Sequence, residues 1–244
     1  MARESSTLTG RAGSGSDSGA TLRAYGGEGG DTRVARRRSA LIDAGLDLLG
    51  AGENATVTVR GVCRQAGLTA RYFYESFESV DELVGVLYDE VISELADAGL
   101  RAFDEGSDME SKVRGGVTAM VDIIAADQRK GRLLFSQSLQ SPVIAAKRME
   151  STTLFAGLTL QSASGVIDLD PELGSGAAFG IAHYQVGGLS RLLAAWVEGD
   201  VDMTRDAIVD LSVRLLLAPA ELFHVHGLID RAGGGRSNAA ESST

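Results

Sequence analysis

The chain has 244 residues, of which 44% are hydrophobic and 23% charged, so it can bury the core of one large or two small domains. We expect neither a membrane span, which needs roughly 18 apolar residues in a row, nor a secretory signal. The single cysteine, Cys63, excludes an internal disulfide framework and indicates a cytoplasmic location. The net charge of -10 argues at first against nucleic acid, because Lys and Arg drive phosphate binding.

Charge is distributed unevenly along the chain. Residues 33–78 carry seven arginines against five acidic residues, a balance of +2. Residues 79–244 carry 13 basic against 24 acidic residues, a balance of -11. Residues 1–32 and 231–244 are rich in Gly and Ser without apolar periodicity, and we expect both to be disordered tails. The folded part is therefore predicted to run from about 33 to 230.

Helix signals run through this folded part, with no convincing strand. An amphipathic helix from Val34 stops at Gly50, and later starts and stops follow from polar caps, proline and glycine. These later signals are, in chain order, Ser79, Ser107, Asp127, Ser141, Gly165, Asp170, Gly199, Thr204 and Pro219. The predicted fold class is all-α, with about nine helices that form an N-terminal three-helix helix-turn-helix domain and a C-terminal helical bundle.

Residues 58–77 contain the pattern of two short helices joined by a tight turn. Thr58 can cap the first helix, Gly67 can supply the left-handed conformation of the turn, and Thr69 can cap the second helix. The geometry favours a helix-turn-helix.

The second of these short helices has two different faces. At 100° per residue, Phe73 and Phe77 fall together and must face the core. The opposite side carries Arg71, Tyr72 and Glu75. A short helix that presents Arg and Tyr outward is the geometry that enters a DNA major groove.

The segment from Arg33 to Leu83 resembles the DNA-binding domain of the TetR family of bacterial transcriptional regulators. The resemblance rests on the amphipathic first helix, on Thr58-Val59-Arg60, on Ala66-Gly67-Leu68-Thr69, and on Tyr74 followed by Phe77. Beyond this segment the likeness is limited to the number of helices and to a final pair of long helices.

The resemblance implies both the domain division and the function. It implies a DNA-binding domain over 33–78 and a ligand-binding and dimerisation domain over 79–230. A homodimer of this kind binds double-stranded DNA at a palindromic operator, and a small-molecule effector most often releases it as a repressor. No cofactor and no membrane partner is expected. An activator or adaptor with the same helix-turn-helix remains open from the residues.

An α-helical enzyme is the competing class. It would need a nucleophile with a base, paired carboxylates or metal-spaced ligands, and no such pattern is present. Cys63 falls inside the helix-turn-helix, and His224 and His226 at i,i+2 do not share a helical face. We therefore predict that the protein is not an enzyme and holds no metal.

The candidate DNA-binding residues lie on the first three helices. Arg71 and Tyr72 are the candidates for contact with base edges, although a solvated Arg71 paired with Glu75 at i,i+4 is the competing interpretation. The others would contact phosphates or an adjacent minor groove, and Tyr74 matches the family's phosphate-contacting tyrosine. The full set is Arg33, Arg36, Arg37, Arg38, Thr58, Arg60, Thr69, Arg71, Tyr72 and Tyr74.

Two positions depart from the family pattern. Many members begin the fourth helix with a lysine that meets a phosphate, whereas this chain has Val80. Glu75 places an acid on the groove side, where it would repel phosphate, accept from a cytosine amino group or fix the angle of Arg71. We expect affinity to depend on the arginines and to fall steeply with salt.

Apolar residues with a few polar handles on the middle and late helices are candidates for an effector pocket, although each taken singly is more often a core residue. They are Met120, Phe135, Met149, Phe155, Phe179, His183, Tyr184 and Trp196. Four glycines interrupt the predicted helix over 170–198, namely Gly176, Gly180, Gly187 and Gly188. They suggest the close approach of another backbone, as in a dimer interface shared with the helix over 204–218.

Overall fold

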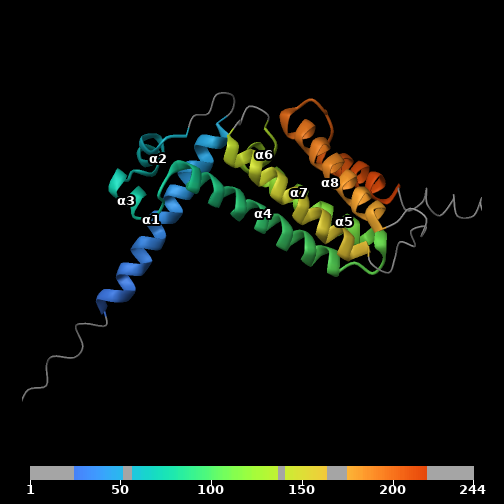
Figure 1. Ribbon diagram of the computed structural model, residues 1–244, viewed down its shortest axis with the longest axis horizontal. Helices are drawn as coiled ribbons and strands as arrows, with labels where there is room; N and C mark the ends of the chain where they lie inside the picture. The colour runs from blue at the N-terminus through green and yellow to red at the C-terminus, as the bar shows by residue number, and fades with distance from the viewer. Residues whose placement is uncertain (1–24, 52–56, 137–140, 164–174, 219–244) are drawn as a thin grey trace, which may run out of the picture.

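The computed structural model describes residues 25–51, 57–136, 141–163 and 175–218, in which every regular element is a helix (Figure 1). The helices are α1 (Tyr25–Gly50), α2 (Val59–Ala66), α3 (Ala70–Tyr74), α4 (Val80–Asp104), α5 (Met109–Ala126), α6 (Gln128–Phe135), α7 (Pro142–Ala163) and α8 (Ser175–Glu198). Residues 205–218 form a ninth helical segment. The prediction of an all-α fold with about nine helices is confirmed.

Helix α1 differs from its prediction at one end. It stops at Gly50 as predicted, but it begins at Tyr25 rather than near residue 33. The added part, Tyr-Gly-Gly-Glu-Gly-Gly-Asp, is rich in glycine. Because glycine has a low helix propensity, the sequence does not predict a helix there. The remainder of both predicted tails lies outside the described residues, as do the predicted signals at Gly165, Asp170 and Pro219.

Most predicted helix starts carry the expected cap. The Ser79 hydroxyl accepts a hydrogen bond from the Glu82 N–H at 3.1 Å, and Thr204 accepts from the Ala207 N–H at 3.2 Å. Asp127 caps α6 by accepting from the Arg129 N–H at 3.0 Å. These bonds satisfy N–H groups that have no partner within the helix.

The predicted cap at Ser107 is wrong by one residue. Asp108 is the N-cap of α5, and its carboxylate accepts from the Ser111 N–H at 2.8 Å. The Ser111 hydroxyl in turn accepts from the Asp108 N–H at 3.0 Å, so the capping box pairs Asp with Ser instead of Ser107 with Glu110. A carboxylate is the better acceptor at the positive end of a helix, which explains the shift.

A single hydrophobic cluster joins the small N-terminal domain to the larger body. In the N-terminal part it contains Leu41 of α1 and Phe73 of α3, and in the body it contains Ile124 of α5 and Leu133 of α6. Helix α4 carries the cluster across, because its buried face packs against α1 at one end and against α5 and α7 further along. The two parts are therefore packed as one unit.

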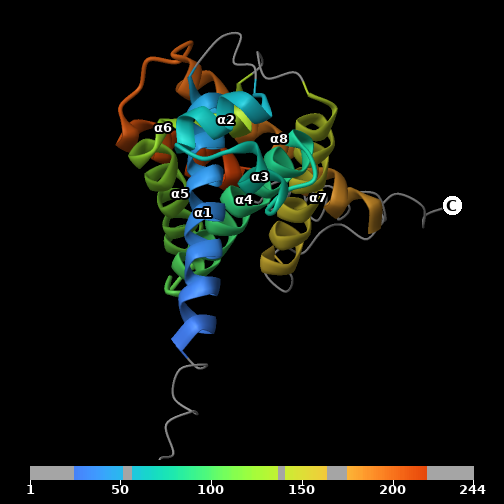
Figure 2. The ribbon, with the colours of Figure 1, turned by 90° about the vertical axis from the view of Figure 1, so that its left-hand side faces the viewer.

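Figures 1 and 2 show where the N-terminal domain lies. Helices α2 and α3 flank the C-terminal half of α1, and the N-terminal half of α1 projects beyond them, away from the body. Helices α4 to α8 and residues 205–218 form the body on the other side. No helix among the described residues has the length and apolar character to cross a membrane.

Candidate DNA interface and ligand pocket

The turn between α2 and α3 has the geometry of a helix-turn-helix. The Thr58 hydroxyl accepts from the Gly61 N–H at 3.0 Å and so caps α2. Gly67 ends α2 with a φ of 65°, a conformation that favours glycine. The Leu68 N–H then donates to the Cys63 carbonyl at 2.9 Å and closes the turn. These bonds fix the direction of α3 relative to α2.

Helix α3 separates buried from exposed side chains as the spacing predicts. Phe73 is fully buried and Phe77, just beyond the helix, is 2% exposed. Their rings lie 5.7 Å apart and anchor α3 to the core. The Arg71 side chain is 84% exposed and Tyr74 is 61% exposed. Thr69 precedes the helix, and its side chain makes no capping bond.

Glu75 holds two arginines of the exposed face. The Arg71 Nε donates to the Glu75 carboxylate at 3.0 Å, and an Arg37 Nη lies 3.9 Å from the other carboxylate oxygen. The Arg37 guanidinium also lies 4.2 Å from the centre of the Tyr72 ring, so this tyrosine is partly covered. The carboxylate therefore fixes Arg71 in the free protein, which was the competing interpretation for this residue.

The other arginines fall into two groups. Arg33 and Arg36 are exposed on the projecting part of α1, and Arg60 is exposed on α2. Arg38 is half-buried, with its guanidinium 4.3 Å from the centre of the Phe77 ring. The Arg38 Nη1 is buried and has no hydrogen-bond partner within the described part of the chain. Its placement favours packing over contact with a nucleic acid.

Helix α6 clamps the C-terminal end of α1. Arg129 forms ion pairs with Asp43 at 3.0 Å, with Asp47, and with Asp127 at 2.7 Å. Arg132 donates to the Gly50 carbonyl at 2.6 Å. Five charged side chains thus meet where α1 joins α6.

The contacts between α6 and α1 also affect the pKa values of two aspartates and the space around Gly50. Hydrogen bonds from Gln65 and Arg129 hold the pKa of Asp47 below its ordinary value, and the Arg129 bonds do the same to the pKa of Asp127. A Cβ placed on Gly50 would lie 2.7 Å from the Arg129 Cβ, so only glycine allows this approach.

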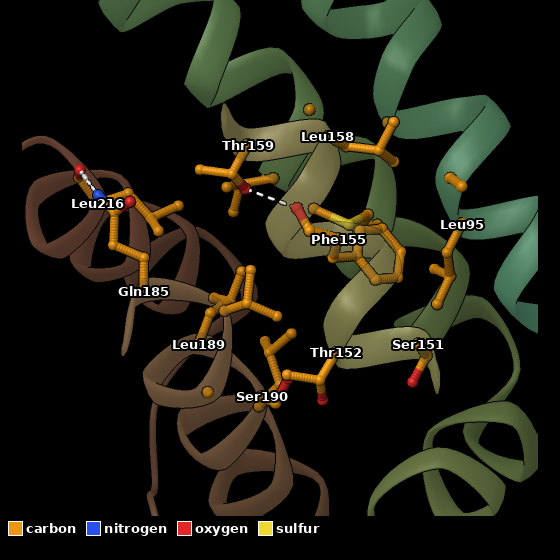
Figure 3. A pocket seen from close by; sticks show the side chains of 18 of the residues that line it. Leu95, Ser151, Thr152, Phe155, Leu158, Thr159, Gln185, Leu189, Ser190 and Leu216 are labelled. Atoms are coloured by element: carbon orange, nitrogen blue, oxygen red, sulfur yellow. Dashed lines mark hydrogen bonds between the residues drawn. The ribbon is translucent and has the colours of Figure 1, made fainter. Parts of the chain in front are cut away.

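A cavity of about 560 Å³ lies in the body, between α4, α5, α7, α8 and residues 205–218 (Figure 3). Most of its lining is aliphatic or aromatic. Of the eight residues predicted for a pocket, Met120, Phe135 and Phe155 line it. Its size and lining suit a small organic molecule.

The other five predicted pocket residues do not line this cavity. Met149 and Tyr184 are 75% and 78% exposed, and Phe179 is 48% exposed. The His183 ring lies against Phe179, with centroids 4.3 Å apart. The Trp196 indole N–H donates to the Met203 carbonyl at 2.9 Å, so this side chain holds the turn that follows α8.

Polar groups in the cavity wall include three that sequence reasoning missed. The Tyr88 hydroxyl lies 3.3 Å from the Ser151 hydroxyl, and Gln185 donates to the Leu216 carbonyl at 2.7 Å. Arg148 donates to the carbonyls of Leu134 and Ser136 at 2.9 and 2.7 Å.

A helical pattern could have revealed Arg148. It shares one face of α7 with the buried Ile144 and the pocket residue Phe155, at spacings of four and seven residues. An arginine within a buried stripe is the signal that was available.

Solved structures of transcriptional regulators share this fold. Similar chains include the fatty acid degradation regulator FadR from Bacillus halodurans, with 20% identity, a TM-score of 0.62 and coverage of 74% of this chain and 94% of that one. A TetR-family regulator from Streptomyces coelicolor has 16% identity and a TM-score of 0.61, covering 82% and 86%. A TetR-like regulator from Rhodococcus sp. RHA1 has 18% identity and a TM-score of 0.58, covering 74% and 93%.

No protein-family model and no curated protein matches the sequence. The fold is that of TetR-family transcriptional regulators. The structural likeness extends over the body as well as the 50 residues that carried the sequence resemblance, since each comparison covers more than two thirds of the chain.

Proposed function

We propose that the protein is a DNA-binding transcriptional regulator that acts as a homodimer at a palindromic operator and represses until a small-molecule effector binds in the body. The observation that carries the proposal is α3, a short helix fixed by Phe73 and Gly67 that presents Arg71 and Tyr74 to solvent. Arg71 suits the O6 and N7 atoms of guanine, and the exposed Arg33, Arg36 and Arg60 suit phosphates.

Exposed apolar side chains on the late helices support the homodimer. Phe179 and Tyr184 of α8, and Leu215 of the segment 205–218, are 48%, 78% and 55% exposed. A Cβ placed on Gly180 or Gly188 of α8 would meet no described residue within 4 Å, so the part of the chain that the structure describes makes no close approach to these glycines. A second copy packed here would cover the apolar surface and place two α3 helices on one DNA duplex.

The position of α6 supports release by an effector. Its C-terminal residues Leu134 and Phe135 line the cavity, and its N-terminal residue Arg129 holds α1. A molecule that displaces one end of this eight-residue helix would disturb the other. Helix α6 therefore contacts both the cavity and helix α1 of the N-terminal domain. Through it, binding of a ligand in the cavity can be coupled to binding of DNA.

The decisive experiment is capture of genomic DNA fragments by the purified full-length protein, followed by footprinting of the enriched sequences. We expect a protected palindrome whose half-sites lie about one helical turn apart, ~34 Å. Arg71→Ala should lose the enrichment, whereas Arg101→Ala, at an exposed position of α4, should keep it. Absence of any enriched sequence would refute the proposal. Rising transcription of the bound promoter on deletion of the gene would identify a repressor, and falling transcription an activator.

A further inference from the structure

The charge of the cavity wall is opposite to that of the body. The chain has a net charge of -10, and residues 79–244 alone have a balance of -11. Yet the described residues that line the cavity include two arginines, Arg148 and Arg191, and no Asp or Glu. The described lining of this cavity therefore carries positive charge, although the protein as a whole is acidic.

Arg148 is the more buried of these two charges. It is half-buried, and burial lowers the pKa of its guanidinium because the charged form loses water. Glu198 is the one carboxylate whose charge acts on it within the described part of the chain, and no hydrogen bond joins the two. Burying a cation that donates no hydrogen bond to a carboxylate of the described residues is costly, and such a site attracts an anion.

Among the described residues, the hydrogen bonds of Arg148 involve only one edge of its guanidinium. Its Nε donates to the Leu134 carbonyl and one Nη2 proton donates to the Ser136 carbonyl. A guanidinium has five N–H groups, so the edge formed by Nη1 and Nη2 keeps donors for a carboxylate. Arg148 can thus bind an anion while it still holds the end of α6.

Three hydroxyl groups, those of Tyr88, Ser151 and Thr152, also line the cavity near Arg148. Thr152 donates to the Arg148 carbonyl at 2.8 Å, and Ser151 donates to the same carbonyl at 3.0 Å. Their protons are therefore occupied by the backbone of α7. The Tyr88 hydroxyl lies at this end of the cavity, where the charge of Arg148 acts on it, and it donates its own proton to the Ser151 oxygen at 3.3 Å. The guanidinium of Arg148 is therefore the donor that an anion would meet here.

Most of the remaining lining is apolar, although Gln185 and Arg191 of α8 also belong to it. Figure 3 shows Leu95, Phe155, Leu158 and Leu189 around the space, with Ser151 and Thr152 along one side of α7. A mostly apolar wall that contains a half-buried arginine fits a molecule that has an apolar body and one negatively charged group.

We propose that the effector is an amphipathic organic anion, whose carboxylate pairs with Arg148 and whose apolar part fills the cavity between α4, α5, α7 and α8. This inference rests on the proposed function for its regulatory meaning, but the choice of ligand follows from the cavity itself. A cationic ligand would meet two positive charges and no carboxylate among the described lining residues. A neutral molecule would bring no charge that complements Arg148.

The test compares probes of equal shape and different charge by isothermal titration against the full-length protein. The probes are dodecanoate, dodecan-1-ol and dodecylammonium, with 2-naphthoate and 2-naphthol as a second shape. We expect each carboxylate to bind about 10-fold or more tightly than its alcohol, because charge-assisted hydrogen bonds are stronger than neutral ones. Dodecylammonium should bind most weakly of the three alkyl probes.

The variants assign the preference to one side chain. Arg148→Gln should bring the carboxylate-to-alcohol ratio close to one, and Arg148→Lys should restore part of it. Arg101→Gln, at an exposed position on α4 outside the cavity, should leave it unchanged. Thermal unfolding of each variant shows whether the end of α6 remains folded. If Arg148→Gln does not fold, the ratio in Arg148→Lys against wild type still decides the matter.

Three results would overturn the proposal: equal affinity for carboxylates and alcohols, a preference that survives in folded Arg148→Gln, or no binding of any carboxylate. Operator binding is measured separately by fluorescence anisotropy with and without dodecanoate. Binding that depends on Arg148 but does not change operator affinity would leave the ligand class intact and contradict effector release. If the protein binds its operator but binds no carboxylate, the proposed DNA-binding function stands and the proposed ligand class is wrong.

Discussion

At the scale of single residues, the contact between Arg71 and Glu75 decides how the exposed face of α3 can act. Arg71 is the one arginine of α3, its side chain is 84% exposed, and its Nε donates to the Glu75 carboxylate at 3.0 Å. An arginine held by one carboxylate still has free N–H groups for the O6 and N7 atoms of guanine. Two substitutions separate the roles of the two side chains.

Arg71→Ala should weaken operator binding by about 1 to 3 kcal/mol, because a bidentate contact with guanine is lost. The loss should be confined to the cognate sequence and should disappear on a duplex with that base pair changed. Fluorescence anisotropy with both duplexes provides the measurement. An unchanged affinity and sequence preference would mean that Arg71 is a solvated residue paired with Glu75.

Glu75→Gln should strengthen DNA binding at low salt by about 0.5 to 1 kcal/mol, since a negative charge near phosphates is removed. The gain should be similar on cognate and unrelated duplexes and should shrink as salt rises. Anisotropy titrations at several salt concentrations measure it. Weaker binding of the cognate duplex alone would instead show that the Glu75 carboxylate accepts from a cytosine amino group.

At the scale of elements, the turn before α3 depends on one backbone conformation. Gly67 has a φ of 65°, and an added Cβ would meet no atom within 4 Å, so backbone strain alone opposes a side chain there. Gly67→Ala should lower the free energy of unfolding by about 1 to 2 kcal/mol. Gly157→Ala is the matched control, because Gly157 lies inside α7 with the same open space and an ordinary φ. It should stabilise the protein by up to ~1 kcal/mol, as measured by chemical denaturation at fixed protein concentration.

The clamp between α6 and α1 should make stability depend on acid pH. Arg129→Met should lower the free energy of unfolding at pH 7 by about 1 kcal/mol, a figure kept small because solvent screens the partly exposed Arg129. The pKa values of Asp47 and Asp127 are lowered from an ordinary value of 3.8, so their contribution is complete above that pH. It is lost as the pH falls through the lowered pKa values.

The difference in stability between wild type and Arg129→Met should therefore be constant near neutral pH and shrink below about pH 4. Thermal unfolding at a series of pH values measures it. Arg205→Met is the control, because Arg205 pairs with Asp122 and Asp206 away from α1. A difference that stays constant down to pH 2 would contradict the clamp.

Much of the fold follows from local signals in the sequence, and much of the cavity does not. Gly67, Phe73 and Phe77 act within one short segment, so their spacing predicts their places. Arg148 takes its role from carbonyls at the end of α6, and Met149, the next residue, is exposed although it is apolar. The packing of several helices decides which face of a long helix lines a cavity. The sequence of one helix therefore does not predict that face.

At the scale of the whole molecule, the proposed homodimer depends on the surface of α8 and residues 205–218. Tyr184→Glu should convert a homodimer into monomers, because a charge would be buried opposite its copy. Sedimentation at micromolar concentration should show the change, and operator affinity should fall by orders of magnitude. Ser93→Glu adds the same charge at an exposed position of α4 and should alter neither. A monomeric wild-type protein would refute the homodimer.

Helix α1 is long enough to act as a lever. Its 26 residues span about 39 Å, with Gly50 wedged against Arg129 at one end and exposed arginines toward the other. A tilt of about 3° around the wedged end would move the far end by about 2 Å, which is enough to break a hydrogen bond. A displacement of α6 too small to alter the packing around the cavity would thus be magnified at the tip. A small tilt of α1 would then be enough to change DNA binding, without a large rearrangement of the other helices.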